Sequence, residues 1–322
     1  MEGSEKMQDM NPYTGWRTNC YATSLGMLLS RKGNPKPIPY IDCLTTLPFG
    51  PFIYLRKIGF AVMGIDPEKG VDHALSLLGY ECLLTFGNSE KEAIEKLKNN
   101  LKKDWILIGP VDMSYLTYDP FCKKKKAANH YIVAVDFDND FIWINDPEGY
   151  IEVPLSWRDF LKAWEAKRIY YKKASYTQRL LGEKVAKLTE EEIFKRVLEK
   201  VSQIFEGENI PPDALYGGEA IRSFADDLTK KGVSMLELTF TLPVCNQRCY
   251  DSSIFLAQES FTNKALKEAS KVRMRQARLF GKCRLFAAKK DTDALCSTLK
   301  RIADLDISYV KMLIEGVSAL RR

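Results

Sequence analysis

"NHYIVAVDFDNDFIWINDPEGYIEV", residues 129–153, decides how the first half of the chain folds. Two runs rich in β-branched and aromatic residues, 131–137 and 141–145, flank the turn sequence DND. The pattern predicts a hairpin, followed by a third strand over 150–153. Because a short turn brings the start of one antiparallel strand beside the end of the next, we expect His130 and Asp146 to be neighbours.

Histidine is scarce in this sequence, which narrows the choice of a catalytic base to two residues. His73 lies on a predicted amphipathic helix that ends at Gly79, where we expect a packing or solvent-facing role. A carboxylate beside His130 would select its tautomer and stabilise the imidazolium during proton transfer. Asp146 is the natural candidate, with Asn145 as a nearby substitute; the simpler interpretation is that "NDPEG" is only a turn.

A second informative stretch is "GWRTNCYATSLGMLLSRKG", residues 15–33. Its apolar residues recur at the spacing of one buried helix face, and they are Ala22, Leu25, Leu28 and Leu29. Gly33 and the following "NPKPIP" end this helix. Cys20 therefore lies in the first turn, where unpaired N–H groups and the helix dipole favour a thiolate. The alternative is a buried thiol that packs at a helix entrance.

The remaining patterns predict an α+β first domain over residues 1–175 and a mainly helical second domain over residues 176–322. In the first domain we expect strands at 59–65, 80–86, 105–111 and 168–173, and helices at 69–78, 89–103 and 156–165. Beyond residue 176 the strand patterns thin out. Helical patterns then cover 193–205, 216–231, 250–285 and 290–319.

A cysteine early on a helix, then a histidine on a strand, then an aspartate on the next strand is the chain order of papain-like cysteine enzymes. The block around Cys20 and residues 130–164 resemble the C39-like peptidase superfamily, including "NDP" and the trailing helix. The chain is more closely similar to the family of the butirosin-pathway aminoglycoside acyltransferase. That family also carries a glycine-rich loop and strand, here 49–65, and a helical domain that "YGGEAIRSFADDL" (216–228) and "RCYDSSIFLAQES" (248–260) resemble.

The resemblance implies a papain-like (C39-like) domain followed by a helical domain, acting in biosynthesis as an acyltransferase. An acyl group would pass from a thioester donor, on an acyl carrier protein or coenzyme A, through Cys20 to a small amine acceptor. His130 would move the protons, and Asp146 would orient it. The alternatives are a C39-like cysteine peptidase or amidase, and a catalytically silent binding protein of the same fold.

Two departures from these families concern the oxyanion site. Asn19 stands where the acyltransferase family tends to have histidine, and Thr14 stands where papain-like proteases place a glutamine. The side-chain amide of Asn19 and the backbone N–H of Cys20 could form a different oxyanion site. The missing glutamine weakens the protease interpretation more than the acyltransferase one, and it leaves open a chain that has lost activity.

Positive charge is concentrated in two places. Residues 263–290 hold ten lysines and arginines against one acid, Glu268. Six of the basic residues follow helical spacing and form a stripe, which consists of Lys264, Lys267, Lys271, Arg275, Arg278 and Lys282. A second cluster, Lys123, Lys124, Lys125 and Lys126, precedes His130. Both could dock an acidic partner such as an acyl carrier protein, or could simply be solvated. Nucleic acid is not expected because no binding motif accompanies the stripe.

Composition is that of an ordinary soluble protein, with 45% hydrophobic and 28% charged residues and a net charge of +6. We expect no signal peptide and no membrane span. Eight scattered cysteines indicate reduced thiols in the cytoplasm. Cys245 and Cys249 lack a second ligand pair, so no metal is expected. No phosphate-binding glycine motif follows a strand, so no cofactor is expected.

Overall fold

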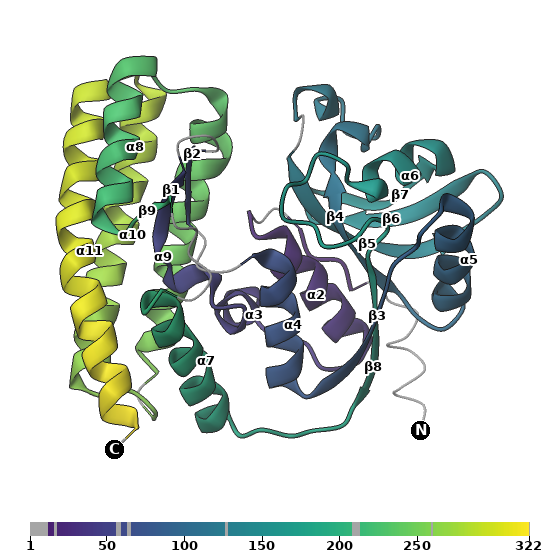
Figure 1. Ribbon diagram of the computed structural model, residues 1–322, viewed down its shortest axis with the longest axis horizontal. Coiled ribbons are helices and arrows are strands. Elements are labelled where there is room, and N and C mark those ends of the chain that lie inside the picture. Colours follow the sequence, from purple (N-terminus) through teal and green to yellow (C-terminus); the bar gives the residue numbers. More distant parts are fainter. Residues whose placement is uncertain are drawn as a thin grey trace. The chain divides into compact units, whose positions relative to one another are not determined.

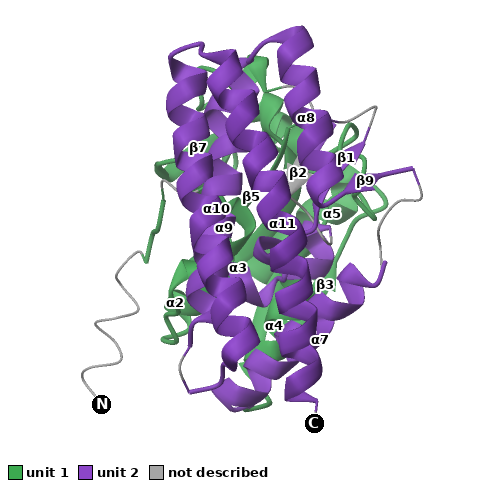
Figure 2. Cartoon of the chain, turned by 90° about the vertical axis from the view of Figure 1, so that its left-hand side faces the viewer, with its two compact units in different colours: residues 1–41, 71–187 green, residues 42–70, 188–322 purple. Residues whose placement is uncertain are grey.

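The computed structural model describes residues 12–15, 18–55, 59–62, 66–125, 128–207, 213–258 and 260–321. The chain forms two compact units, coloured separately in Figure 2. Unit 1 comprises residues 1–41 and 71–187, and unit 2 comprises residues 42–70 and 188–322. Unit 1 is built on a large sheet and unit 2 is mainly helical, which confirms the mixed α and β composition. No helix in these described ranges has the length and apolar character needed to cross a membrane.

Unit 1 centres on a six-stranded antiparallel sheet with the order β3-β8-β4-β5-β6-β7 (Figure 1). Its strands are β3 (Tyr80–Thr85), β4 (Ile106–Asp112), β5 (Asn129–Phe137), β6 (Phe141–Asp146), β7 (Tyr150–Ser156) and β8 (Gln178–Lys184). The predicted hairpin is therefore confirmed as β5 and β6. Two short 3₁₀ helices, η2 (Met113–Tyr115) and η3 (Cys122–Lys124), lie in the loop that leads from β4 to His130.

Helices pack against both faces of this sheet. α5 (Glu90–Leu101) and α6 (Trp157–Glu165) share a buried core with Ile132 and Ile144 of the hairpin. α2 (Cys20–Arg31) packs against β5 at Tyr131, whose side chain points to the opposite face from that of Ile132. α2 begins at Cys20, which therefore lies in the first turn as predicted. After the helix, the N–H of Asn34 donates to the carbonyl of Leu29 (2.9 Å).

Unit 2 combines a three-stranded sheet with a helical bundle. The sheet has the order β2-β1-β9, with β1 (Phe52–Leu55), β2 (Gly59–Val62) and β9 (Leu215–Tyr216). Its helices are α3 (Ile38–Leu44), η1 (Leu47–Phe49), α4 (Pro67–Leu78), α7 (Glu190–Phe205), α8 (Gly218–Lys231), the π-helical turn η4 (Glu237–Thr241), α9 (Leu242–Leu256), α10 (Lys264–Ala288) and α11 (Thr292–Leu320). α3 and α4 are shared, since the division between the units falls within each of them. Phe52 joins sheet and bundle, because its ring lies 5.6 Å from that of Phe280 on α10.

A buried arginine holds the early segment 42–70 to the helices of unit 2. Arg273 is fully buried on α10, where its Nη2 donates to the carbonyl of Pro48 (2.8 Å) and its Nη1 donates to Gln276 (2.9 Å). Its guanidinium stacks 4.3 Å from the ring centre of Tyr309 and lies 3.8 Å from the carboxylate of Asp306. Because these groups accept hydrogen bonds from the guanidinium or balance its charge, the positive charge of Arg273 is tolerated inside the core.

Two predicted elements are wrong. Residues 168–173 form turns instead of a strand, and Tyr170 is 66% exposed, so this aromatic run has no strand partner to pack on. The strand that the sheet uses is β8, whose sequence "QRLLGEK" lacks a β-branched run. The single helix predicted over 250–285 is two helices, because Asn263 caps a new one by accepting from the N–H of Leu266 (3.0 Å).

The division into units differs from the predicted boundary at residue 175 in two ways. β8 pairs with β3 and β4, which keeps residues up to 187 in unit 1. Residues 42–70 belong to unit 2, where Phe52 is part of the helical core. Local patterns predict elements, whereas these two assignments depend on partners far away in the chain.

Candidate active site

The start of α2 carries the candidate nucleophile. Cys20 is the first residue of the helix and is half-buried. The N–H groups of a first helical turn lack intrahelical partners and favour negative charge there. The rest of the helix is anchored to β5, because the hydroxyl of Ser24 donates to the carbonyl of Tyr131 (3.0 Å). The rings of Tyr21 and Tyr131 also meet edge to face, with centroids 6.1 Å apart. These contacts hold the helix against the strand that carries His130.

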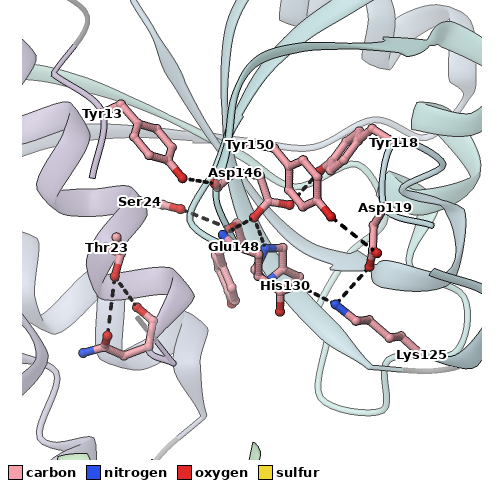
Figure 3. Close-up of polar contacts among 12 residues, drawn as sticks. Tyr13, Thr23, Ser24, Tyr118, Asp119, Lys125, His130, Asp146, Glu148 and Tyr150 are labelled. Atoms are coloured by element: carbon pink, nitrogen blue, oxygen red, sulfur yellow. Dashed lines mark hydrogen bonds and ion pairs between the residues drawn. The ribbon is translucent and has the colours of Figure 1, made fainter. Parts of the chain in front are cut away.

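The hairpin brings His130 and Asp146 together, as the sequence predicts. His130 Nε2 lies 2.7 Å from Asp146 Oδ1, and both side chains are buried (Figure 3). The register of β5 and β6 explains why Asp146 lies on the same face of the sheet as His130. Asn145 pairs with Val133, and successive residues of a strand point to opposite faces. Asp146 therefore shares the face of His130.

Cys20 completes the group, since it lies close enough to His130 for its charge and hydrogen bonding to raise the pKa of the imidazole. Asp146 occupies Nε2, so Nδ1 is the ring nitrogen left for the thiol. Burial lowers the pKa of His130, but the charges and hydrogen bonds of Asp146 and Cys20 outweigh it and hold this pKa well above the ordinary value. A protonated imidazole beside sulfur supplies the positive charge that stabilises a thiolate.

The carboxylate of Asp146 is held by further donors. The hydroxyl of Tyr118 donates to Oδ2 (2.7 Å), and the backbone N–H of Glu148 donates to Oδ1 (2.7 Å). Burial raises the pKa of Asp146, but its contacts with His130, the Glu148 N–H and the Tyr118 hydroxyl outweigh burial and hold this pKa below its ordinary value. At pH values above its lowered pKa, Asp146 is therefore ionised beside a protonated His130. The hydroxyl of Tyr13 also donates to the backbone carbonyl of Asp146 (2.8 Å).

A charged network surrounds these donors (Figure 3). Lys125 forms ion pairs with Asp119 (3.0 Å) and with the carboxylate of Glu148. The ring of Tyr150 packs against that of Tyr118, with centroids 5.0 Å apart, and its hydroxyl makes a long contact with Asp119 (3.5 Å). The network braces the loop that carries Tyr118.

Sequence reasoning missed Tyr118 and Tyr13. Tyr118 lies in the loop "YLTYDPFC", where an aromatic residue between polar ones carries little local signal. Tyr13 reaches a residue 133 positions later in the chain. Only the folded chain reveals either contact.

The two supporting asparagines differ in what they contact. Asn145 is buried, and its side-chain oxygen accepts from the N–H of Glu152 (2.9 Å), which ties β6 to β7. The residue that orients His130 is therefore Asp146, and the substitute is not needed. Asn19 is buried at the N-cap of α2, where its side-chain oxygen accepts from the hydroxyl of Thr23 (3.4 Å) instead of capping the helix. Its oxyanion role stays a prediction.

The predicted partner-binding residues fall into two groups. Beside the site, Lys123 lies over the ring of Tyr115 and Lys124 over that of Phe121, while Lys125 is engaged in the ion pairs described above. Lys126 lies outside the described residues. On α10 of unit 2, the three basic residues named for partner binding are exposed, and they are Lys271, Arg275 and Arg278.

Two comparisons with known proteins give similarity without an activity. A family described as the YobF C-terminal domain matches residues 211–313. Over 303 residues the chain is 29% identical to the "Uncharacterized protein YobF" of Bacillus subtilis (strain 168), which spans 92% of this chain and 96% of that protein. The similarity thus covers both units. It does not test the predicted resemblance to the C39-like and butirosin-pathway families, which stays a prediction.

Proposed function

We propose that the protein is an acyltransferase of papain-like fold that uses Cys20 as its nucleophile. The observation that carries this proposal is the buried His130–Asp146 pair, next to a cysteine at a helix N-terminus that helps to raise the pKa of His130. A nucleophile, a base and a group that orients the base are the three parts that covalent acyl transfer needs.

The reaction would have two halves. In the first, the Cys20 thiolate attacks the carbonyl of a thioester donor, the C–S bond of the donor breaks, and His130 gives its proton to the departing thiol. In the second, an amine attacks the Cys20 thioester, His130 takes a proton from the amine, and the Cys20 thiolate leaves. Asp146 stabilises the imidazolium in both halves. The backbone N–H of Cys20, together with the amide of Asn19, would bind the oxyanion.

The donor we propose is an acyl thioester of an acyl carrier protein or of coenzyme A, and the acceptor is a small amine. Exchange between thioesters is nearly isoenergetic, so sulfur suits such a donor. All eight cysteines are free, which supports the further proposal that the protein works in the reducing cytoplasm.

The test is intact-protein mass spectrometry after incubation with a panel of small acyl thioesters. We expect a mass increase of one acyl group that is absent in Cys20→Ala and is discharged by added amines. Acylation that decays at the same rate with and without amines would favour a hydrolase. Cleavage of peptides without any response to thioesters would favour a C39-like peptidase. A chain that no acyl donor modifies would contradict acyl transfer and leave a silent binding protein.

A further inference from the structure

A groove runs between α9 and α10 of unit 2. It encloses about 530 Å³. Its apolar lining comes from Ile254, Ala257 and Met274, and its basic lining from Lys271, Arg275 and Arg278. Figure 2 shows the two helices side by side on one face of the bundle. The groove therefore combines a hydrophobic floor with a positively charged edge.

The floor of the groove includes exposed apolar side chains. Ile254 is 49% exposed, and so is Tyr250 one turn earlier on α9. Apolar side chains gathered in a hollow and bordered by polar groups are typical of a surface that a partner covers. Such a partner must bring an apolar side chain of its own.

The basic edge continues beyond the groove at both ends. The exposed residues Lys264, Lys267 and Lys282 extend the same stripe, which spans about 27 Å at the 1.5 Å rise of a helix. Glu268 is the one acid of residues 263–290, and it is already paired with Lys271 (2.7 Å). A row of this length matches a helix of five turns that carries carboxylates along one side.

A second hollow of about 220 Å³ lies on the other side of the stripe, between α10 and α11. It shares Arg275 with the first and also includes Leu305, Arg301 and Asp304, whose carboxylate is already paired with Arg222. Arg275 thus forms a ridge between two recesses. A helix lying along the stripe would therefore pass over this guanidinium.

We propose that this groove docks an acidic amphipathic helix of a partner protein, with its apolar side chains between α9 and α10 and its carboxylates on the stripe. A nucleic acid would satisfy the charges but leave the floor around Ile254 and Met274 uncovered. A membrane surface favours apolar side chains that protrude, whereas these line a hollow. This docking does not depend on acyl transfer, because no residue of the groove belongs to the Cys20 site.

The first measurement is fluorescence anisotropy of a labelled helical peptide, a 20-residue sequence of Glu and Ala with two leucines four positions apart. We expect Lys271→Glu with Arg275→Glu to weaken binding by about tenfold or more at low salt. The difference should shrink near 1 M salt, where charges are screened beyond about 3 Å. The matched control is Arg196→Glu with Lys230→Glu, which changes the net charge equally at exposed positions on α7 and α8 and should bind like the parent.

The second measurement tests the floor. Ile254→Asn, and replacement of the peptide leucines by alanine, should each weaken binding by about fivefold, an effect that persists at high salt because it is not Coulombic. Circular dichroism and melting of each variant report whether it is folded. The proposal is overturned if the peptide does not bind, if the control pair loses as much affinity, or if the leucines do not matter. It is also overturned if duplex DNA or phosphatidylglycerol vesicles bind as tightly and ignore Ile254→Asn.

Discussion

Removing the Tyr118 hydroxyl tests whether Asp146 is tuned by its surroundings. Tyr118→Phe keeps the ring that packs against Tyr150 and deletes only the donor that lies 2.7 Å from Asp146 Oδ2. A hydrogen bond to a charged group contributes about 1.5–3 kcal/mol, and one pKa unit corresponds to about 1.4 kcal/mol. The Tyr118 hydroxyl is one of several donors that lower the pKa of Asp146, so its removal should raise that pKa toward its ordinary value.

A higher pKa of Asp146 changes how the stability of the protein depends on pH. The pKa of Asp146 lies below its unfolded value, so its contribution to stability is complete above that value and is lost as pH falls through the folded pKa. In Tyr118→Phe this contribution should be smaller, and its loss should be complete at higher pH. A protonated Asp146 no longer balances the imidazolium of His130, so the positive charge beside Cys20 should be less stable and Cys20 should react more slowly.

The assay is the pH dependence of Cys20 alkylation by iodoacetamide, followed by peptide mass spectrometry. We expect the acid limb of the rate profile to move up by about one pH unit in Tyr118→Phe. Tyr150→Phe is the matched control, because it makes the same chemical change at a long 3.5 Å contact with Asp119. A limb that stays in place in Tyr118→Phe, or moves equally in Tyr150→Phe, would refute the reasoning.

Three further predictions concern both units. Cys20 should react fastest with iodoacetamide among the eight cysteines, and first labelling of another cysteine would contradict the assigned nucleophile. Cys20→Ala should lower the pKa of His130, because Cys20 helps to raise it. NMR titration of the two histidines measures this pKa, and an unchanged value would show that Cys20 and His130 do not interact. Arg273→Met should lower the free energy of unfolding by about 3–5 kcal/mol by leaving buried Asp306 without its cation, whereas exposed Arg284→Met should change it by less than about 0.5 kcal/mol. Equal melting of these two variants would show that the buried cation is dispensable.

The sequence predicts the part of the site that is built from elements adjacent to one another along the chain. The start of α2 follows from helix periodicity, and the meeting of His130 with Asp146 follows from a single hairpin. Tyr118 and Tyr13 depend on loop conformation and on contacts across the chain, which no local pattern encodes. Only the structure shows that both reach Asp146.

The same limit explains the errors in the fold. β8 lies between β3 and β4, and its Arg179 is buried against Asp72, a pairing that its own sequence does not suggest. The aromatic run at 168–173 has strand propensity but no neighbour, so Tyr170 remains exposed. Propensity predicts a strand only where a sheet edge is available to receive it.

The interleaving of the two units limits how this protein can be divided. Residues 42–70 interrupt unit 1 and supply unit 2 with Phe52 and the carbonyl that Arg273 binds. A fragment that begins at residue 188 would leave that guanidinium and the ring of Phe280 without these partners. The same holds for the matched range 211–313. Unit 1 and unit 2 are each made of two separate stretches of sequence, so a chimera with a single crossover point cannot exchange either unit whole.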